Sequence, residues 1–138
     1  MGASNTGLRN RAVGLLSVIL VLLGACGKEQ SPIEVVQSFM TAVEAFDLST
    51  AESLVCEAQR SRVRESLEPF DDVAGLGEAF DMSFDDLSFQ EQSSDGKVAI
   101  VQVSGTLTIS FLGQQEVQEI SEEHVVIEQG GRWVICDP

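Results

Sequence analysis

The sequence predicts an α+β domain in which N-terminal helices pack on a bent, four-stranded antiparallel sheet. Apolar residues recur at helical spacing between residues 33 and 46, whereas apolar and polar residues alternate between residues 98 and 111. Two turn signals, Asp95-Gly96 and Gly130-Gly131, separate the stretches that have a period of two. Helices first and strands afterwards is the order typical of an α+β domain.

A secretory leader is predicted ahead of this domain. It has a positive start at Arg9 and Arg11 and an apolar run over residues 13–23, which is too short to span a bilayer as a helix. The run ends at Leu23-Gly24-Ala25-Cys26, which resembles a bacterial lipobox. The resemblance implies that Cys26 is acylated, with palmitate among its chains, and becomes the first mature residue. The alternatives are ordinary signal cleavage after small residues and an uncleaved membrane anchor.

This interpretation divides the chain into a signal peptide over 1–25, a short linker over 26–30 and one α+β domain over 31–138. We expect the protein on the extracytoplasmic side of the bacterial cell membrane, held there by its lipid. The chain has 22 acidic residues against 8 basic ones and a net charge of −14. That balance argues against nucleic acid as a partner and favours a solvated, self-repelling surface over a cation-binding role.

The three cysteines of the chain bear on a possible disulfide bond. Three cysteines are an odd number for an exported chain. If Cys26 carries lipid, Cys56 and Cys136 remain, and an oxidising compartment favours a disulfide between them. Such a bond would stabilise the domain by about 4.5 kcal/mol at most in the chain-entropy model. The alternative is two buried free thiols.

Three helices are expected first. Ser31-Pro32-Ile33-Glu34 is a capping box with proline at the first helical position, and this helix ends before Asp47. Ser49-Thr50-Ala51-Glu52 repeats the pattern and predicts a short helix to Cys56. A third helix covers residues 59–67, and Pro69 ends it. Residues 71–82 are predicted to form a loop with one helical turn.

Four strands follow. The first holds Leu87 and Phe89, and the second runs from Val98 to Phe111 with Gly105 at a bend or bulge. Its apolar face is expected to point inward along its whole length. The third covers residues 117–129, with a bulge between Val117 and Ile120, and the fourth starts at Arg132.

At this point the chain resembles a known family. Residues 36–47 are similar to the first helix of nuclear-transport-factor-2-like (NTF2-like, cystatin-like) cone domains, although Phe46 stands where glycine is common. Gly131-Arg132-Trp133-Val134-Ile135-Cys136 is similar to the closing strand of exported members of the DUF4878 type, which often pair that cysteine with one in the second helix. The resemblance implies the cone fold and the same disulfide.

An enzyme is not expected. Isomerase-like members need a carboxylate base and a hydrogen-bond donor, usually tyrosine, and this chain has no tyrosine. The single histidine, His124, is interpreted as a surface residue of a strand rather than a general base. No metal site or cofactor is expected, and Asp71, Asp72, Asp81, Asp85 and Asp86 are interpreted as a solvated edge.

A binding or interaction role remains. Arg60, Arg62 and Arg64 would grip an anionic ligand or partner, unless they only pair with Glu57 and Glu68. Phe70, Phe80, Met82 and Phe84 would line the mouth of a pocket for a small apolar ligand, unless they only plug the cone.

The other class of function is a structural one. Val98 and Ile100, on the second face of the long strand, suggest a homodimer or contact with an envelope protein.

Overall fold

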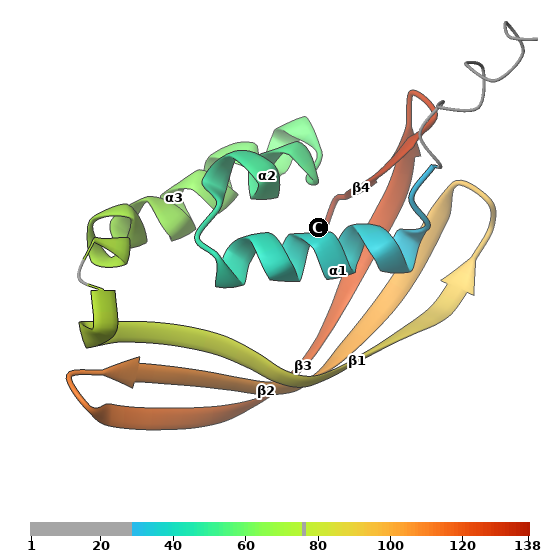
Figure 1. Ribbon diagram of the computed structural model, residues 1–138. Helices are drawn as coiled ribbons and strands as arrows, with labels where there is room; N and C mark the ends of the chain where they lie inside the picture. The colour runs from blue at the N-terminus through green and yellow to red at the C-terminus, as the bar shows by residue number, and fades with distance from the viewer. Residues whose placement is uncertain (1–28, 76) are drawn as a thin grey trace, which may run out of the picture.

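The computed structural model describes residues 29–75 and 77–138 and confirms the predicted order of helices followed by strands (Figure 1). The predicted lipidation site, Cys26, lies outside the described residues. The helical part comprises α1 (Pro32–Glu44), α2 (Leu48–Ser53), α3 (Glu57–Ala74) and the short 3₁₀ helix η1 (Gly77–Ala79). The strands are β1 (Phe80–Ser94), β2 (Val98–Phe111), β3 (Gln114–Gln129) and β4 (Arg132–Ile135).

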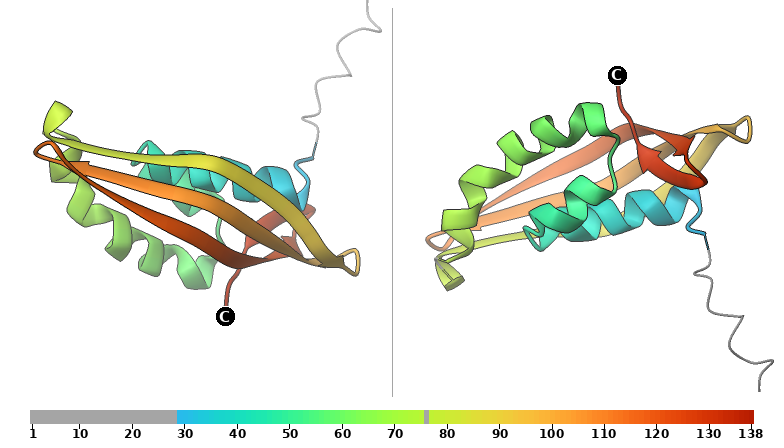
Figure 2. Two further views of the ribbon diagram at one scale, coloured as in Figure 1. Left: turned by 90° about the horizontal axis from the view of Figure 1, so that it is seen from below. Right: turned by 90° about the horizontal axis from the view of Figure 1, so that it is seen from above.

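The strands form one antiparallel meander in the order β1-β2-β3-β4. Both predicted turns are confirmed, and Gly96, Gly130 and Gly131 have positive φ angles there, which glycine tolerates best. The helices lie together on one face of the curved sheet, as the two views of Figure 2 show. The molecule therefore has two layers, with its core between the helices and the sheet.

The first helix begins and ends as its sequence directs. Ser31 and Glu34 form the predicted capping box, in which each side chain accepts a hydrogen bond from the backbone N–H of the other. At the other end, Phe46 has a φ of 53°, and the N–H groups of Phe46 and Asp47 donate to the carbonyls of Val43 and Ala42. This is a Schellman motif, and its left-handed residue explains why glycine is common where this chain has Phe46.

The second and third helices differ from the prediction. Asp47, not Ser49, caps α2, because its carboxylate accepts from the Thr50 N–H and hydroxyl. Pro69 does not end α3, which continues through it to Ala74. Proline removes a backbone hydrogen bond there, but the next residue, Phe70, stacks on Phe46 at 5.6 Å between ring centroids. Packing between helices thus supports the segment that was expected to be a loop.

The strand pairing is irregular beside Gly105, where a bend or bulge was predicted, but the irregularity lies on the neighbouring strand. The register of β1 against β2 shifts between Asp85 and Ser88, where Asp86 has a φ of 53°. A Cβ atom at Gly105 would lie 2.9 Å from the carbonyl oxygen of Asp85 and equally close to Leu87. Only glycine allows this approach of the two backbones.

The bulge expected in β3 is absent, and that prediction was wrong. The pairing of β2 with β3 runs without a shift from Phe111 opposite Gln114 to Val98 opposite Ile127. Val117 and Ile120 simply point to opposite faces of a regular strand. The first strand was also underestimated, because β1 begins at Phe80 and includes the last three residues of the expected loop.

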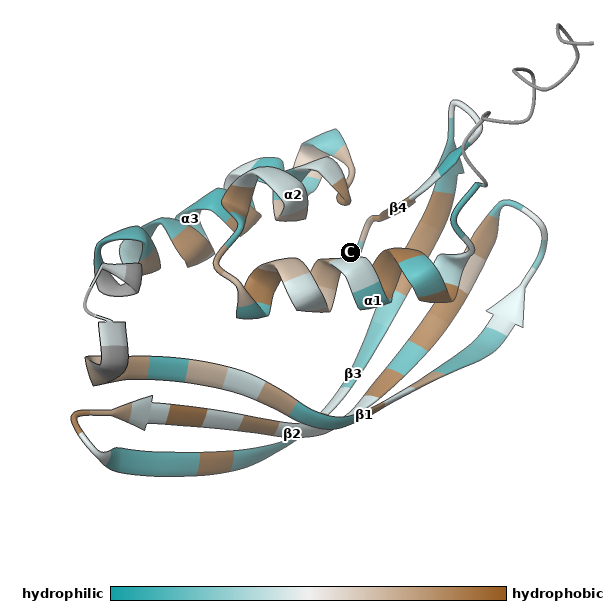
Figure 3. Cartoon of the chain, viewed as in Figure 1, coloured by the Kyte–Doolittle hydropathy of each residue, from teal (hydrophilic) through white to brown (hydrophobic). Residues whose placement is uncertain are grey.

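The core lies where α1 crosses the sheet. A cluster of fully buried side chains joins α1 to β2, β3 and β4, and the apolar bands of these elements face one another in Figure 3. Its members are Val35, Val36, Met40, Val55, Val101, Val103, Val126 and Ile135. The outer half of β2 was expected to be equally buried, but Phe111 at its end is 50% exposed. The helices cover only part of the long strands.

The segment between α2 and α3 runs along the edge of β4. Val55 forms a parallel bridge with Ile135, and the N–H of Cys56 donates to the Ile135 carbonyl. This pairing brings Cys56 beside Cys136, and the two form the predicted disulfide with their Cα atoms 5.3 Å apart. The bond joins residues separated by 80 positions and closes the helical layer onto the last strand.

Candidate ligand-binding site

A pocket of about 440 Å³ lies between the helices and the sheet. Its apolar side chains come from α1, α3, β4 and the segment between α2 and α3: they are Phe39, Val43, Val55, Val63, Leu67 and Ile135. Its polar side chains come from α3, β3 and the tail: they are Gln59, Arg62, Ser66, Glu122, His124 and Asp137. An apolar wall with a few polar groups, at this volume, is typical of a small-molecule site.

His124 is the central polar group of this pocket, and its predicted place on the surface was wrong. Only 8% of the residue is exposed, because it lies opposite Val101 on β2 and on the same face as the buried Val126. The Phe39 ring contacts it edge-on at 6.2 Å between centroids. The alternation of β3 carries a signal for this placement, since His124 and Val126 are two residues apart.

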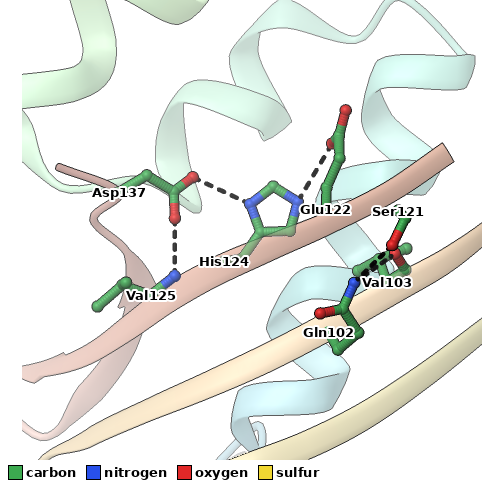
Figure 4. Close-up of polar contacts among 7 residues, drawn as sticks. All are labelled: Gln102, Val103, Ser121, Glu122, His124, Val125 and Asp137. Atoms are coloured by element: carbon green, nitrogen blue, oxygen red, sulfur yellow. Dashed lines mark hydrogen bonds and ion pairs between the residues drawn. The ribbon is translucent and has the colours of Figure 1, made fainter.

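Asp137 holds the imidazole ring in one orientation (Figure 4). Its Oδ2 lies 2.9 Å from Nδ1 of His124, and its Oδ1 accepts a 2.7 Å hydrogen bond from the N–H of Val125. A carboxylate only accepts hydrogen bonds, so Nδ1 carries the proton and Nε2 of the neutral ring is an acceptor. The backbone carbonyl of Asp137 in turn accepts from the amide of the buried Gln59.

The other imidazole nitrogen has no hydrogen-bond partner among residues 29–75 and 77–138. Nε2 of His124 is buried, and its nearest ionic neighbour is Oε2 of Glu122 at 3.8 Å. Such a buried acceptor costs free energy when it stays unpaired. It therefore marks the position where a ligand would donate a hydrogen bond.

The three arginines of α3 go to three different places. Arg64 makes two hydrogen bonds to the carboxylate of Glu52 on α2, at 2.7 and 3.1 Å, which raise the pKa of Arg64 and lower that of Glu52. Arg62 lines the His124 pocket, and Arg60 lines a hollow of about 250 Å³ with Arg132. The structure does not bring them together, and an anion-binding role for any of them stays a prediction.

Two residues of the expected pocket mouth, Phe70 and Phe80, form a cluster with Phe46. Phe46, Phe70 and Phe80 lie 5.6 to 5.9 Å apart between ring centroids, where the ends of α1 and α3 meet β1. Met82 and Phe84 continue along β1 and are half-buried. Rings packed against one another in this way form a plug, and a ligand role for Phe80, Met82 and Phe84 stays a prediction.

The remaining candidates lie on the surface. Asp71, Asp72, Asp81, Asp85 and Asp86 are all exposed. Val98, suggested for a dimer contact, is 38% exposed, and Ile100 is half-buried. A hollow of about 570 Å³ on the outer side of α1 has a mainly polar lining, including Gln37, Ser38 and Thr41. None of these regions contains a buried, unpaired polar group.

Within the described residues, no group of three or more histidine, cysteine, aspartate or glutamate side chains is arranged to hold a metal ion. Across residues 29–75 and 77–138, no helix has the length and apolar character needed to cross a membrane.

Comparison with known proteins places the fold. No model of a protein family matches the chain, and no curated protein does. Among solved structures, the chain is similar to a SEC-C motif containing protein from Rhodopseudomonas palustris, with a TM-score of 0.57 and 14% identity over 78% of this chain and 79% of that one. It is also similar to the intermembrane space region of chloroplast protein ARC6, with a TM-score of 0.56 and 17% identity over 75% and 88%.

A third similar structure is described as a calcium/calmodulin dependent protein kinase II association domain from Xanthomonas campestris. Its TM-score is 0.52, with 14% identity over 73% of this chain and 77% of that one. Together with the helices on a curled four-stranded sheet, these likenesses identify the fold as an NTF2-like α+β cone. Identities this low bear on the fold alone, so function must be argued from the pocket.

Proposed function

We propose that this protein is a lipid-anchored, extracytoplasmic lipoprotein whose NTF2-like domain binds a small molecule without catalysis. The observation that carries the binding role is the pocket itself. It combines an apolar wall with a buried imidazole whose Nε2 has no hydrogen-bond partner. A ligand with an apolar body and a hydrogen-bond donor would satisfy both.

Ligand binding is tested with benzyl alcohol, a small neutral probe with one donor. Titration followed by two-dimensional NMR should shift the signals of His124 and Phe39. A Ser66→Trp variant should abolish these shifts, because Ser66 lines the pocket. Ser61→Trp is the matched control, since Ser61 is an exposed residue of the same helix outside the pocket lining. Equal shifts in both variants would show that the probe binds elsewhere.

The anchoring part of the proposal is supported by the lipobox-like tetrapeptide that ends at Cys26 and by the Cys56–Cys136 disulfide, which suits an oxidising compartment. The finer assignment to exported domains of the DUF4878 type belongs to the same proposal. Labelled palmitate should be incorporated into the natural protein and not into Cys26→Ser. That variant should leave the membrane fraction and still fold; if it stays membrane-bound, the lipobox interpretation is wrong.

A second candidate function is proton transfer. The arrangement of Asp137, His124 and an unpaired Nε2 is that of an oriented general base. We rank it below binding because the Gln59 amide, a donor that could stabilise an oxyanion, already donates to the Asp137 carbonyl. Deuterium incorporation into indanone in heavy water distinguishes the two. Binding alone predicts the background rate, whereas catalysis predicts a faster rate that His124→Asn removes.

A further inference from the structure

We propose that the ligand of the His124 pocket is a small amine with an apolar body, whose ammonium group donates to both His124 and Glu122. This inference rests on the proposed binding function and specifies its ligand. The observation behind it is a pair of acceptors at one point of the pocket wall, Nε2 of His124 and Oε2 of Glu122, which lie 3.8 Å apart (Figure 4).

Both atoms accept, and neither has another partner within hydrogen-bond distance among the described residues. Asp137 fixes the proton on Nδ1 of His124, so Nε2 presents its lone pair. Glu122 lies two residues earlier on β3 and on the same face, which places its carboxylate beside the ring. An ammonium group has three donors and can serve both acceptors, a hydroxyl has one donor, and a carboxylate has none.

Charge favours the same choice. Glu122 and Asp137 contribute two negative charges to the lining, and Arg62 contributes one positive charge; Glu122 and Arg62 are both exposed. The Asp137 carboxylate already accepts hydrogen bonds from His124 and Val125, whereas Glu122 is available for the ligand. The net charge of −14 also attracts cations to the surface as a whole.

The apolar wall accounts for the rest of the ligand. Phe39, Val63 and Leu67 approach the pocket from α1 and α3, on the side opposite to β3. An aliphatic or aromatic body would pack against them while its ammonium group reaches the strand. Inorganic cations and highly charged polyamines would leave the apolar side chains of this wall exposed to water. The proposal is therefore limited to monoamines with a substantial apolar part.

Three probes with the same ring decide the question: benzylammonium, benzyl alcohol and benzoate, titrated by NMR at neutral pH. Benzylammonium should bind about tenfold more tightly than benzyl alcohol, because its hydrogen bonds are charge-assisted, and benzoate should bind most weakly. Glu122→Gln should remove most of the preference for benzylammonium and leave benzyl alcohol unchanged. Glu123→Gln is the control, since this carboxylate is also exposed but lies on the opposite face of β3.

Any other result would refute either the amine ligand or the binding function. Equal affinity for the amine and the alcohol would leave the binding function intact and refute the amine. Tightest binding of benzoate, lost in Arg62→Gln, would refute the amine in favour of an anion. Retention of the amine preference in Glu122→Gln would show that general surface charge causes it. Failure of all three probes to shift the pocket signals would contradict the binding function as well.

Discussion

The carboxylate of Asp137, two residues from the last residue of β4, lies 2.9 Å from the imidazole Nδ1 of His124 in the middle of the pocket wall. The same carboxylate accepts from the Val125 N–H at 2.7 Å. One side chain near the end of the chain therefore orients the central pocket group and satisfies a backbone donor of β3.

Replacing Asp137 with alanine should lower the free energy of unfolding by about 1 to 3 kcal/mol, because the Val125 N–H and the His124 Nδ1 lose their acceptor. Urea denaturation measures the change. Glu123→Ala, which removes an exposed carboxylate from the same sheet, should stay within about 0.5 kcal/mol of the unmodified protein. Equal effects of the two substitutions would contradict the bridging role of Asp137.

Gly105→Ala should destabilise the domain by about 1 to 3 kcal/mol, because the new methyl group would lie 2.9 Å from a backbone oxygen of Asp85 and from the Leu87 side chain. Gly75→Ala is a suitable comparison, since its Cβ would meet only the Asp72 carbonyl at 3.4 Å. Thermal denaturation should give a clearly lower melting temperature for Gly105→Ala than for Gly75→Ala. A stable Gly105→Ala protein would mean that the bend has room to open.

Loss of the Cys56–Cys136 bond should lower the free energy of unfolding by about 4 kcal/mol, because the unfolded chain gains conformational entropy when this long loop is no longer closed. The measurement compares urea denaturation of Cys26→Ser with that of a variant carrying Ser at all three cysteine positions. Alkylation of Cys26→Ser followed by mass spectrometry should modify no thiol without reductant and two thiols with it. Two reactive thiols in the unreduced protein would refute the disulfide.

Stability should fall at acidic pH, partly through Asp47, which caps α2, and Asp95, which holds the turn between β1 and β2. Hydrogen bonds from Thr50 lower the pKa of Asp47, and the N–H groups of Lys97 and Val98 lower that of Asp95. A carboxyl whose pKa is lower in the folded state stabilises the fold fully above its unfolded pKa and loses this effect as pH falls through the folded pKa. The expected loss therefore begins below about pH 5 and grows towards about pH 3.

The check is a series of thermal denaturation curves over that range. Between the upper and the lower end of this pH range, Asp95→Asn should lose less stability than the unmodified protein, because one of the titrating groups is gone. Asp71→Asn, at an exposed position of α3, is the comparison. Identical acid sensitivity in Asp95→Asn and the unmodified protein would assign the effect to other carboxylates.

Local signals predicted the parts of the fold that depend on neighbouring residues. The cap at Ser31 and the turn at Asp95-Gly96 need only the residues beside them, and both form as expected. The alternation along β2 also predicted its length, because a strand places successive side chains on opposite faces. Where packing overrides a local rule, the same reasoning failed, as at Pro69, which stays helical beside the Phe46–Phe70 contact.

The candidate site was the least predictable part. His124 follows two glutamates, Glu122 and Glu123, which suggested exposure, but its burial follows from Phe39 on α1 and Asp137 in the tail. These partners are distant in the chain and meet only when the helices fold over the sheet. The sequence alone determined the order of the elements and the turns, and it predicted the Cys56–Cys136 pair. Only the tertiary structure decided which polar groups face the pocket, because that depends on contacts between elements rather than on any one of them.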